Sequence, residues 1–201
     1  MKRLLDVILV IAAVGLFAVP AALIALVVLF TSPGPILYWS DRVGRDNRLF
    51  KMPKFRSMRI NTPEVASHLL VDSRQWLTPV GRFLRSTSLD ELPQLWCVFN
   101  GSMSMVGPRP ALFNQHDLIA LRTARGVHKL TPGLTGWAQI RGRDDFTSVQ
   151  KADADAWYAA NQSVILDLKI LFATALQVVH ADGTQASHAA KHSATDDARA
   201  A

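Results

Sequence analysis

The stretch VILVIAAVGLFAVPAALIALVVLF, residues 7–30, contains no charged residue and decides the fold class of this 201-residue chain. About twenty apolar residues are enough for a helix to cross the hydrocarbon core of a bilayer. A secretory signal peptide has a shorter apolar stretch followed by a cleavage site of small residues, whereas this stretch continues to Phe30. We therefore expect residues 1–32 to form a retained membrane anchor.

Basic residues flank the anchor on both sides, at Lys2, Arg3, Arg42, Arg45, Arg48, Lys51, Lys54 and Arg56. Because basic residues close to a membrane segment tend to stay cytoplasmic, a single crossing would place one of the two groups on the wrong side. Pro20 removes a backbone donor and favours a bend. The sequence thus predicts a re-entrant helix-break-helix, with a kinked transmembrane helix as the alternative. Asp6 is expected at the interface or beside a basic residue.

The remainder of the chain is predicted to form one mainly helical α+β domain, residues 33–180, followed by a disordered tail, residues 181–201. Short strands are expected at 36–39 and 49–52, joined as a β-hairpin by a polar turn. Residues 131–143 are expected to be mostly turn. Apolar periodicity predicts helices at 79–85, 92–99, 111–124, 146–161 and 163–179, and a short helix is expected at 64–70. The tail contains almost no large apolar residue.

The formal net charge of +6 suits partners that carry phosphate, whether anionic lipid, a nucleotide-sugar or nucleic acid. A membrane-tethered nucleic-acid binder would explain this charge. However, the sequence has no recognition helix, RNP-like motif or zinc-finger pattern, so we expect no nucleic acid. Cys97 is the only cysteine, so an internal disulfide is excluded. It lies in an apolar run of residues.

Two adjacent carboxylates, Asp90 and Glu91, lie at an expected helix start. Ser88 and Glu91 fit a capping box, and helix N-termini favour acidic residues, so a purely structural role explains this motif well. The loop that follows places Arg109 between two prolines, whose fixed backbone suits a guanidinium directed at a phosphate. Carboxylates beside fixed cations are typical of phosphoryl transfer, with Mg²⁺ held by one or both carboxylates.

The chain resembles the bacterial sugar transferases, in particular the small monotopic phosphoglycosyl transferases of the PglC type. The resemblance covers residues 2–180 and rests on five ordered motifs: KR at 2–3 with Asp6, KFRSM at 54–58, SLDELPQ at 88–94, VGPRP at 106–110 and PGLTGWAQ at 132–139. One position departs from the family, because Val19 precedes Pro20 where serine is common. A serine hydroxyl can support the bend of the anchor.

The resemblance implies transfer of a sugar 1-phosphate from a UDP-sugar to a polyprenyl (undecaprenyl) phosphate, with release of UMP, at the start of bacterial glycoconjugate assembly. Asp90 is the implied nucleophile of a ping-pong mechanism with a covalent phosphosugar intermediate. Glu91 is implied to bind Mg²⁺ or to handle protons, and Arg109 to hold phosphate. The resemblance also implies an anchor in membrane lipid and an active site at the cytoplasmic face of the bacterial inner membrane.

Further substrate-binding residues are expected in two other segments. Lys54 and Arg56 share one face of the second strand if that strand continues to residue 58, by its period of two. Gln139, Arg141 and Arg143 lie in a stretch expected near the nucleotide, where each can donate hydrogen bonds.

Asp167 also matches the family and lies in a predicted helix that is apolar on nearly every side, which indicates burial in protein or membrane. A carboxylate in that setting needs a partner. Substrate binding and a structural ion pair, for example to an arginine of the site, are both open. For the whole chain, the alternatives are a membrane-bound glycosyltransferase that releases UDP and a non-catalytic membrane scaffold. No motif indicates which sugar is transferred.

Overall fold

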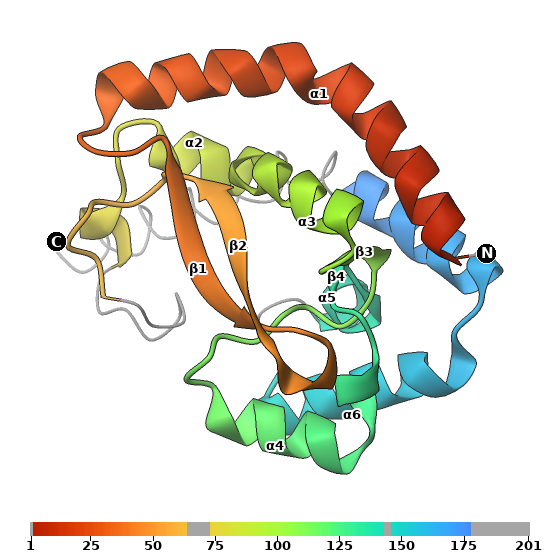
Figure 1. Cartoon of the computed structure of the whole chain (residues 1–201). Helices are drawn as coiled ribbons and strands as arrows, with labels where there is room; N and C mark the ends of the chain where they lie inside the picture. Colours follow the sequence, from red (N-terminus) through yellow and green to blue (C-terminus); the bar gives the residue numbers. More distant parts are fainter. Residues whose placement is uncertain (1, 64–72, 143–145, 178–201) are drawn as a thin grey trace, which may run out of the picture.

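The structure is a computed structural model that describes residues 2–63, 73–142 and 146–177. The helix expected at 64–70, the expected tail at 181–201 and Arg143 lie outside the described residues. Figure 1 shows one long N-terminal helix passing over a body of shorter helices and strands. The site residues all belong to that body.

The regular elements are short apart from the first and the last two helices. In chain order they are α1 (Lys2–Thr31), β1 (Leu37–Val43), β2 (Leu49–Phe55), α2 (Gly81–Ser86), α3 (Leu95–Asn100), β3 (Ser104–Val106), α4 (His116–Ala124), β4 (Gly133–Thr135), α5 (Trp137–Gly142) and α6 (Ser148–Asn161). Residues 164–177 are also helical. Short 3-10 helices are η1 (Arg45–Asn47), η3 (Ser73–Trp76), η4 (Leu89–Gln94) and η5 (Val127–Lys129).

The expected hairpin is confirmed, with β1 and β2 antiparallel from Leu37 opposite Phe55 to Val43 opposite Leu49. The expectation that residues 131–143 are mostly turn is wrong, because this stretch holds β4 and α5. Strand β4 pairs in parallel with β3. Elements of three and six residues are too short to produce a periodic pattern. The prediction of turn therefore rested on the glycines and the proline of this stretch.

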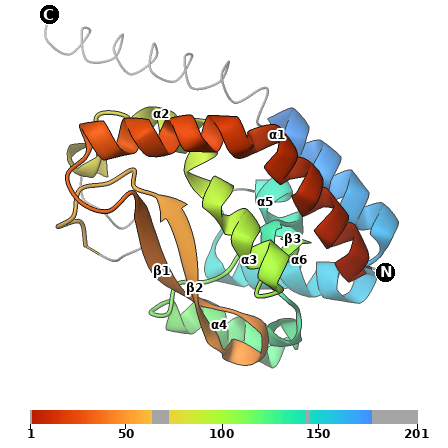
Figure 2. The ribbon, with the colours of Figure 1, turned by 45° about the horizontal axis from the view of Figure 1, so that its top comes forward.

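Helix α1 is continuous through Pro20, and Figures 1 and 2 show it bending midway along its length. The expected helix-break-helix is therefore a bend within one helix, since a proline removes one backbone hydrogen bond without ending the helix. Among the described helices, α1 is long and apolar enough to cross a membrane. Only 6% of its most apolar window is buried, which is what contact with lipid requires.

Both halves of α1 pack on the same body. Near its start, Val10 joins a core cluster with Met52 of β2 and with Leu95, Cys97, Val98 and Met103. Near its end, Val28 is fully buried against Phe55 and Leu84. The two ends of the anchor are thus held on one side of the molecule.

Two further clusters form the rest of the core of the described residues. One lies around Val106, Tyr158 and Ile170, and the other around Ala111, Leu118 and Ala152.

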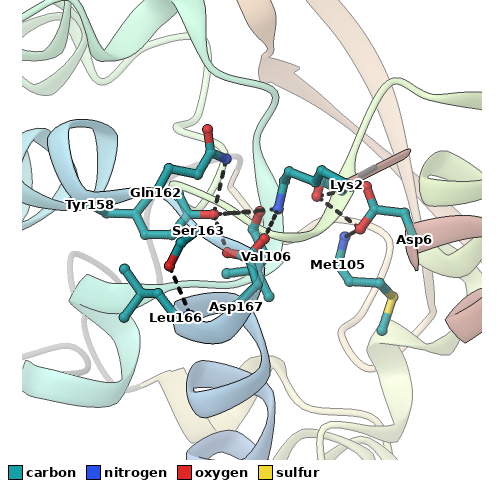
Figure 3. Close-up of polar contacts among 10 residues, drawn as sticks. Lys2, Asp6, Met105, Val106, Tyr158, Gln162, Ser163, Leu166 and Asp167 are labelled. Carbon is teal, nitrogen blue, oxygen red and sulfur yellow. Dashed lines mark hydrogen bonds and ion pairs between the residues drawn. The ribbon is translucent and has the colours of Figure 1, made fainter. Parts of the chain in front are cut away.

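Polar contacts hold the first turns of α1 in place, as Figure 3 shows. Lys2 Nζ donates to Asp167 Oδ2 at 2.6 Å, and the Tyr158 hydroxyl donates to Asp167 Oδ1 at 2.6 Å. Asp6 accepts from Ser104 Oγ and from the Met105 amide. Of its two expected settings, the pairing with a basic residue is therefore not found among the described residues, and the position at the interface stays a prediction. These buried carboxylates connect α1 to β3, α6 and the last described helix.

Apolar side chains remain exposed on three elements that lie side by side. These elements are α1, α3 and the helix of residues 164–177. Helix α3 packs against α1, and Asp167 of the last helix bonds Lys2 of α1 (Figures 1 and 2). On α3 and on residues 164–177, the largest exposed fractions are those of Trp96 at 58%, Ile165 at 67% and Phe172 at 68%. The last helix therefore buries only one face in protein, with Ile170 and Asp167 inward. Exposed apolar surface of this extent indicates a membrane contact.

The loops of the VGPRP and PGLTG motifs meet backbone to backbone. The Gly107 amide donates to Thr135 O at 2.9 Å, and the Gly133 amide donates to Pro108 O at 2.9 Å. A Cβ atom on Gly133 would lie 2.1 Å from Gly107 N, and one on Gly136 would lie 2.1 Å from Gly107 O. Glycine is needed here because no side chain fits between the two chains.

Replacing Gly133 with alanine is expected to lower the free energy of unfolding by about 3 kcal/mol, because the backbone must move to make room. Unfolding followed by circular dichroism in detergent micelles measures this loss. Gly15→Ala is the matched control, since nothing lies within 4 Å of a Cβ atom at Gly15. Equal stability of the two variants would contradict the close approach of the loops.

Candidate active site

The segment that carries the two carboxylates is a 3-10 helix, η4, which continues directly into α3. Ser88 precedes it at φ 57°, in the left-handed region, and its side chain makes no capping hydrogen bond. Pro93 lies inside η4 and has no N–H for a bond to the fourth residue before it, which suits this tighter helix. The capping-box explanation of Ser88 and Glu91 is therefore wrong.

Glu91 is bonded by two cations from distant parts of the chain. Its Oε1 accepts from Lys54 Nζ of β2 at 2.6 Å and from Arg109 Nη2 at 2.8 Å. The side chains of Lys54 and Glu91 are each 17% exposed, while that of Arg109 is 48% exposed. Burial alone would raise the pKa of Glu91, but Arg109 and Lys54 outweigh it and hold that pKa well below its usual range. Glu91 is thus ionised and fixes both cations.

Asp90 is buried, with 7% of its surface exposed. Burial raises the pKa of its carboxyl, and the negative charge of Glu91 adds to this effect. The positive charges of Lys54, Arg85 and Arg109 oppose it. Burial likewise lowers the pKa of Lys54, against the attraction of Glu91. A carboxylate in this setting has lost much of its hydration and is held among cations, as an activated nucleophile requires.

Two further cations of the site, Arg42 and Arg85, were not among the site residues expected from the sequence. Arg42 of β1 donates from Nε to Ser40 Oγ at 3.0 Å and from Nη1 to Pro110 O at 3.3 Å. Burial, followed by repulsion from Arg109, lowers the pKa of Arg42 to about 10. Arg85 of α2 acts on Asp90 through its charge. The sequence feature that could have indicated Arg42 is its position two residues after Ser40, because residues two apart share one face of a strand.

Lys54 and Arg109 bond Glu91, whereas the other expected binding residues that the structure describes contact different groups. Arg56 is buried and donates from Nε to Pro35 O at 2.8 Å, beside the loop that follows α1. Gln139 donates to Leu134 O, and the guanidinium of Arg141 lies 4.6 Å from the ring centroid of Trp137. Asp167 pairs with Lys2 and Tyr158, so its partner is not the arginine that was suggested. Substrate roles for these residues stay predictions.

The arrangement provides two carboxylates of different character within one turn. Within the described residues, Asp90 is buried near cations and makes no salt bridge, whereas Glu91 is ionised and is bonded by Lys54 and Arg109. Around them, Lys54, Arg109, Arg42 and Arg85 give an excess of positive charge. Such a site can attract a dianionic diphosphate and stabilise the charge that develops on a transferred phosphoryl group.

Comparison with known proteins gives a match over nearly the whole described chain. The family model for the bacterial sugar transferases matches residues 1–181. The UDP-galactose-lipid carrier transferase of Erwinia amylovora is 38% identical over 82% of this chain. The UDP-glucose:undecaprenyl-phosphate glucose-1-phosphate transferase of Escherichia coli is 38% identical over 87% of it. An uncharacterized sugar transferase of Bacillus subtilis is 41% identical over 75% of it.

The relatives differ in length. The chain spans 73% of the Bacillus subtilis relative but only 37% of the Erwinia amylovora protein and 39% of the Escherichia coli protein. The matched region is therefore a part of these longer proteins. Asp90, Glu91, Lys54 and Arg109 all lie inside the region that the family model covers.

Proposed function

Since the chain belongs to the bacterial sugar transferase family, we propose that it transfers a sugar 1-phosphate from a UDP-sugar to a polyprenyl phosphate and releases UMP. The observation that carries this proposal is the carboxylate pair, with Asp90 buried among cations and Glu91 bonded by Lys54 and Arg109. The names of the relatives, which specify UDP-sugar donors and undecaprenyl phosphate or a lipid carrier as acceptor, support the substrate class.

In the first half-reaction, a carboxylate oxygen of Asp90 attacks the phosphorus of the β-phosphate, which carries the sugar. A bond forms between Asp90 and phosphorus, the bond from that phosphorus to the bridging oxygen breaks, and UMP leaves with the bridging oxygen. Lys54 and Arg109 offset the repulsion between the carboxylate and the diphosphate. Glu91 keeps these two cations in position through hydrogen bonds of 2.6 and 2.8 Å.

In the second half-reaction, a phosphate oxygen of the polyprenyl phosphate attacks the same phosphorus and the Asp90 carboxylate leaves. The product is a polyprenyl diphosphate sugar, and Asp90 returns to its starting state. Two separate steps allow one nucleophile to serve a soluble donor and a lipid acceptor in turn. The exposed apolar surface of α1, α3 and residues 164–177 supports this assignment, because a chain held in lipid by that surface meets the acceptor where its phosphate lies, at the edge of the hydrocarbon.

We propose that Mg²⁺ binds jointly to the protein carboxylates and to the substrate phosphates. Among residues 2–63, 73–142 and 146–177, no group of three or more acidic, histidine or cysteine side chains could enclose a metal ion. Mg²⁺, however, commonly binds one or two carboxylates together with substrate phosphates, and Asp90 and Glu91 offer these. When bound there, the ion would neutralise phosphate charge.

We further propose that α1 enters and leaves the bilayer on the cytoplasmic side of the inner membrane. The support is the burial of Val10 and Val28 against the same body, together with the ion pair of Lys2. A helix that crossed the bilayer could not keep both contacts, because its ends would be separated by about 30 Å of hydrocarbon.

This topology is tested by labelling the two ends of the anchor separately. An epitope tag before Met1 and a cysteine in place of the exposed Arg48 should both be accessible in inverted membrane vesicles and protected in intact spheroplasts. The native Cys97 is buried, so it gives little background. Periplasmic accessibility of either site would refute the re-entrant arrangement.

The reaction itself is tested by identifying the nucleotide product. With UDP-glucose or UDP-galactose, Mg²⁺ and undecaprenyl phosphate, the proposal predicts UMP. Release of UDP would instead identify a glycosyltransferase that transfers the sugar alone. No turnover of any UDP-sugar in a panel, with the protein folded, would favour the non-catalytic scaffold.

A further inference from the structure

We infer that Arg122 of α4 and Asp155 of α6 form a positioning pair for Arg109, an inference that rests on the proposed function. Arg122 Nη1 donates to the main-chain oxygen of Arg109 at 2.8 Å. Its Nε and Nη2 both donate to Asp155 Oδ2, at 2.9 and 2.6 Å. The same guanidinium thus joins a buried carboxylate to the backbone of the proposed phosphate ligand.

The backbone around Arg109 is held through its carbonyl groups. Prolines on either side of Arg109 have no N–H to donate. Instead, four consecutive carbonyl oxygens each accept a hydrogen bond from a different donor: Pro108 from the Gly133 amide, Arg109 from Arg122, Pro110 from Arg42 and Ala111 from the Val43 amide. The bond from Arg122 is made to Arg109 itself, whose side chain bonds Glu91.

Asp155 determines the orientation of the Arg122 guanidinium. Its side chain is 2% exposed and that of Arg122 is 11% exposed, so water competes little with the pair. Two nitrogens of the planar guanidinium are taken by the carboxylate, and the third is thereby directed at the Arg109 carbonyl. Lysine can keep the ion pair but cannot make both contacts in this geometry, because it offers a single nitrogen.

A second ion pair joins the same two helices and provides a matched control. Arg125 Nε donates to Asp153 Oδ1 at 2.7 Å, and Arg125 Nη1 donates to Leu121 O. The Asp153 side chain is 58% exposed. Loss of Arg125 tests whether any ion pair between these two helices matters to the enzyme. Because this pair is more exposed than that of Arg122 and Asp155, the cycle with Arg109→Ala below separates a positioning role from a structural one.

The test compares UMP release by Arg122→Lys and Arg125→Lys in the full-length chain. We expect Arg122→Lys to lower kcat/KM for the UDP-sugar about 10- to 100-fold, the scale of a small displacement of a binding group. Arg125→Lys should change it less than about twofold. If Arg122→Lys does not fold, the neutral double variant Arg122→Gln with Asp155→Asn replaces it. Equal effects of the two lysine variants would overturn the inference.

A double-mutant cycle with Arg109→Ala separates this inference from the proposed function. If Arg122 acts through Arg109, the Arg122→Lys change should have less than about a twofold effect once the Arg109 side chain is absent. An undiminished effect in that background would overturn the inference and leave the role of Arg109 intact. If Arg109→Ala alone left kcat/KM unchanged, the proposed phosphate contact itself would be refuted.

Discussion

Asp90→Asn is expected to reduce UMP release by about 10⁴-fold or more, because an amide cannot serve as the nucleophile of the first half-reaction. The change preserves the shape of a side chain that is 7% exposed. It also removes a buried negative charge beside Glu91, so the folded state should survive. Steady-state release of UMP from a UDP-sugar, measured with and without undecaprenyl phosphate, gives the result.

Asp41→Asn is the control for the Asp90 variant. Asp41 accepts from Lys51 Nζ at 2.8 Å on the exposed side of the hairpin, and its loss should leave the rate within about twofold of the native value. An Asp90→Asn protein that retains native turnover would remove Asp90 from the mechanism. The first half-reaction would then require another nucleophile.

Lys54→Met is expected to lower kcat about 10²- to 10³-fold, the typical cost of removing one preorganised charge from a transition state. Methionine keeps the apolar stem in a largely buried position, so the loss is mainly electrostatic. Lys54 is the strongest of the cations that oppose the raised pKa of Asp90, and it is one of the two that hold Glu91. Removal of Lys54 therefore takes a stabilising positive charge away from Asp90 and a hydrogen bond away from Glu91.

Lys51→Met tests whether any lysine of β2 would have the same effect. Lys51 lies three residues before Lys54 on the same strand, but its side chain is 63% exposed and pairs with Asp41. We expect its turnover to stay within about twofold of the native value, as for other exposed ion pairs. If Lys51→Met and Lys54→Met were equally impaired, the proposed role of Lys54 would be wrong.

The sequence predicted those parts of the molecule that depend on local patterns. The uncharged stretch from 7 to 30 indicated α1, and the short strand-like stretches on either side of the polar turn indicated the β1–β2 hairpin. Lys54 and Arg109 were singled out by motifs, and in the structure each of them bonds Glu91. Their roles toward a substrate stay predictions.

Contacts between distant segments were not predictable in this way. Asp167 pairs with Lys2, 165 positions away, and Arg42 bonds Pro110, 68 positions away. No local pattern reports such pairs, because they depend on how helices and strands pack. The capping box was a local prediction and still wrong, since Pro93 and the left-handed Ser88 produce a 3-10 helix instead.

The most direct test of the central claim is intact-mass spectrometry of the chain mixed with a UDP-sugar and Mg²⁺ in the absence of acceptor. With UDP-glucose or UDP-galactose as the donor that turns over, the account predicts a phosphohexose adduct on Asp90 and one UMP released per chain. Undecaprenyl phosphate should then remove the adduct. An adduct on another residue, or turnover to UMP with no adduct at any time, would contradict the covalent mechanism.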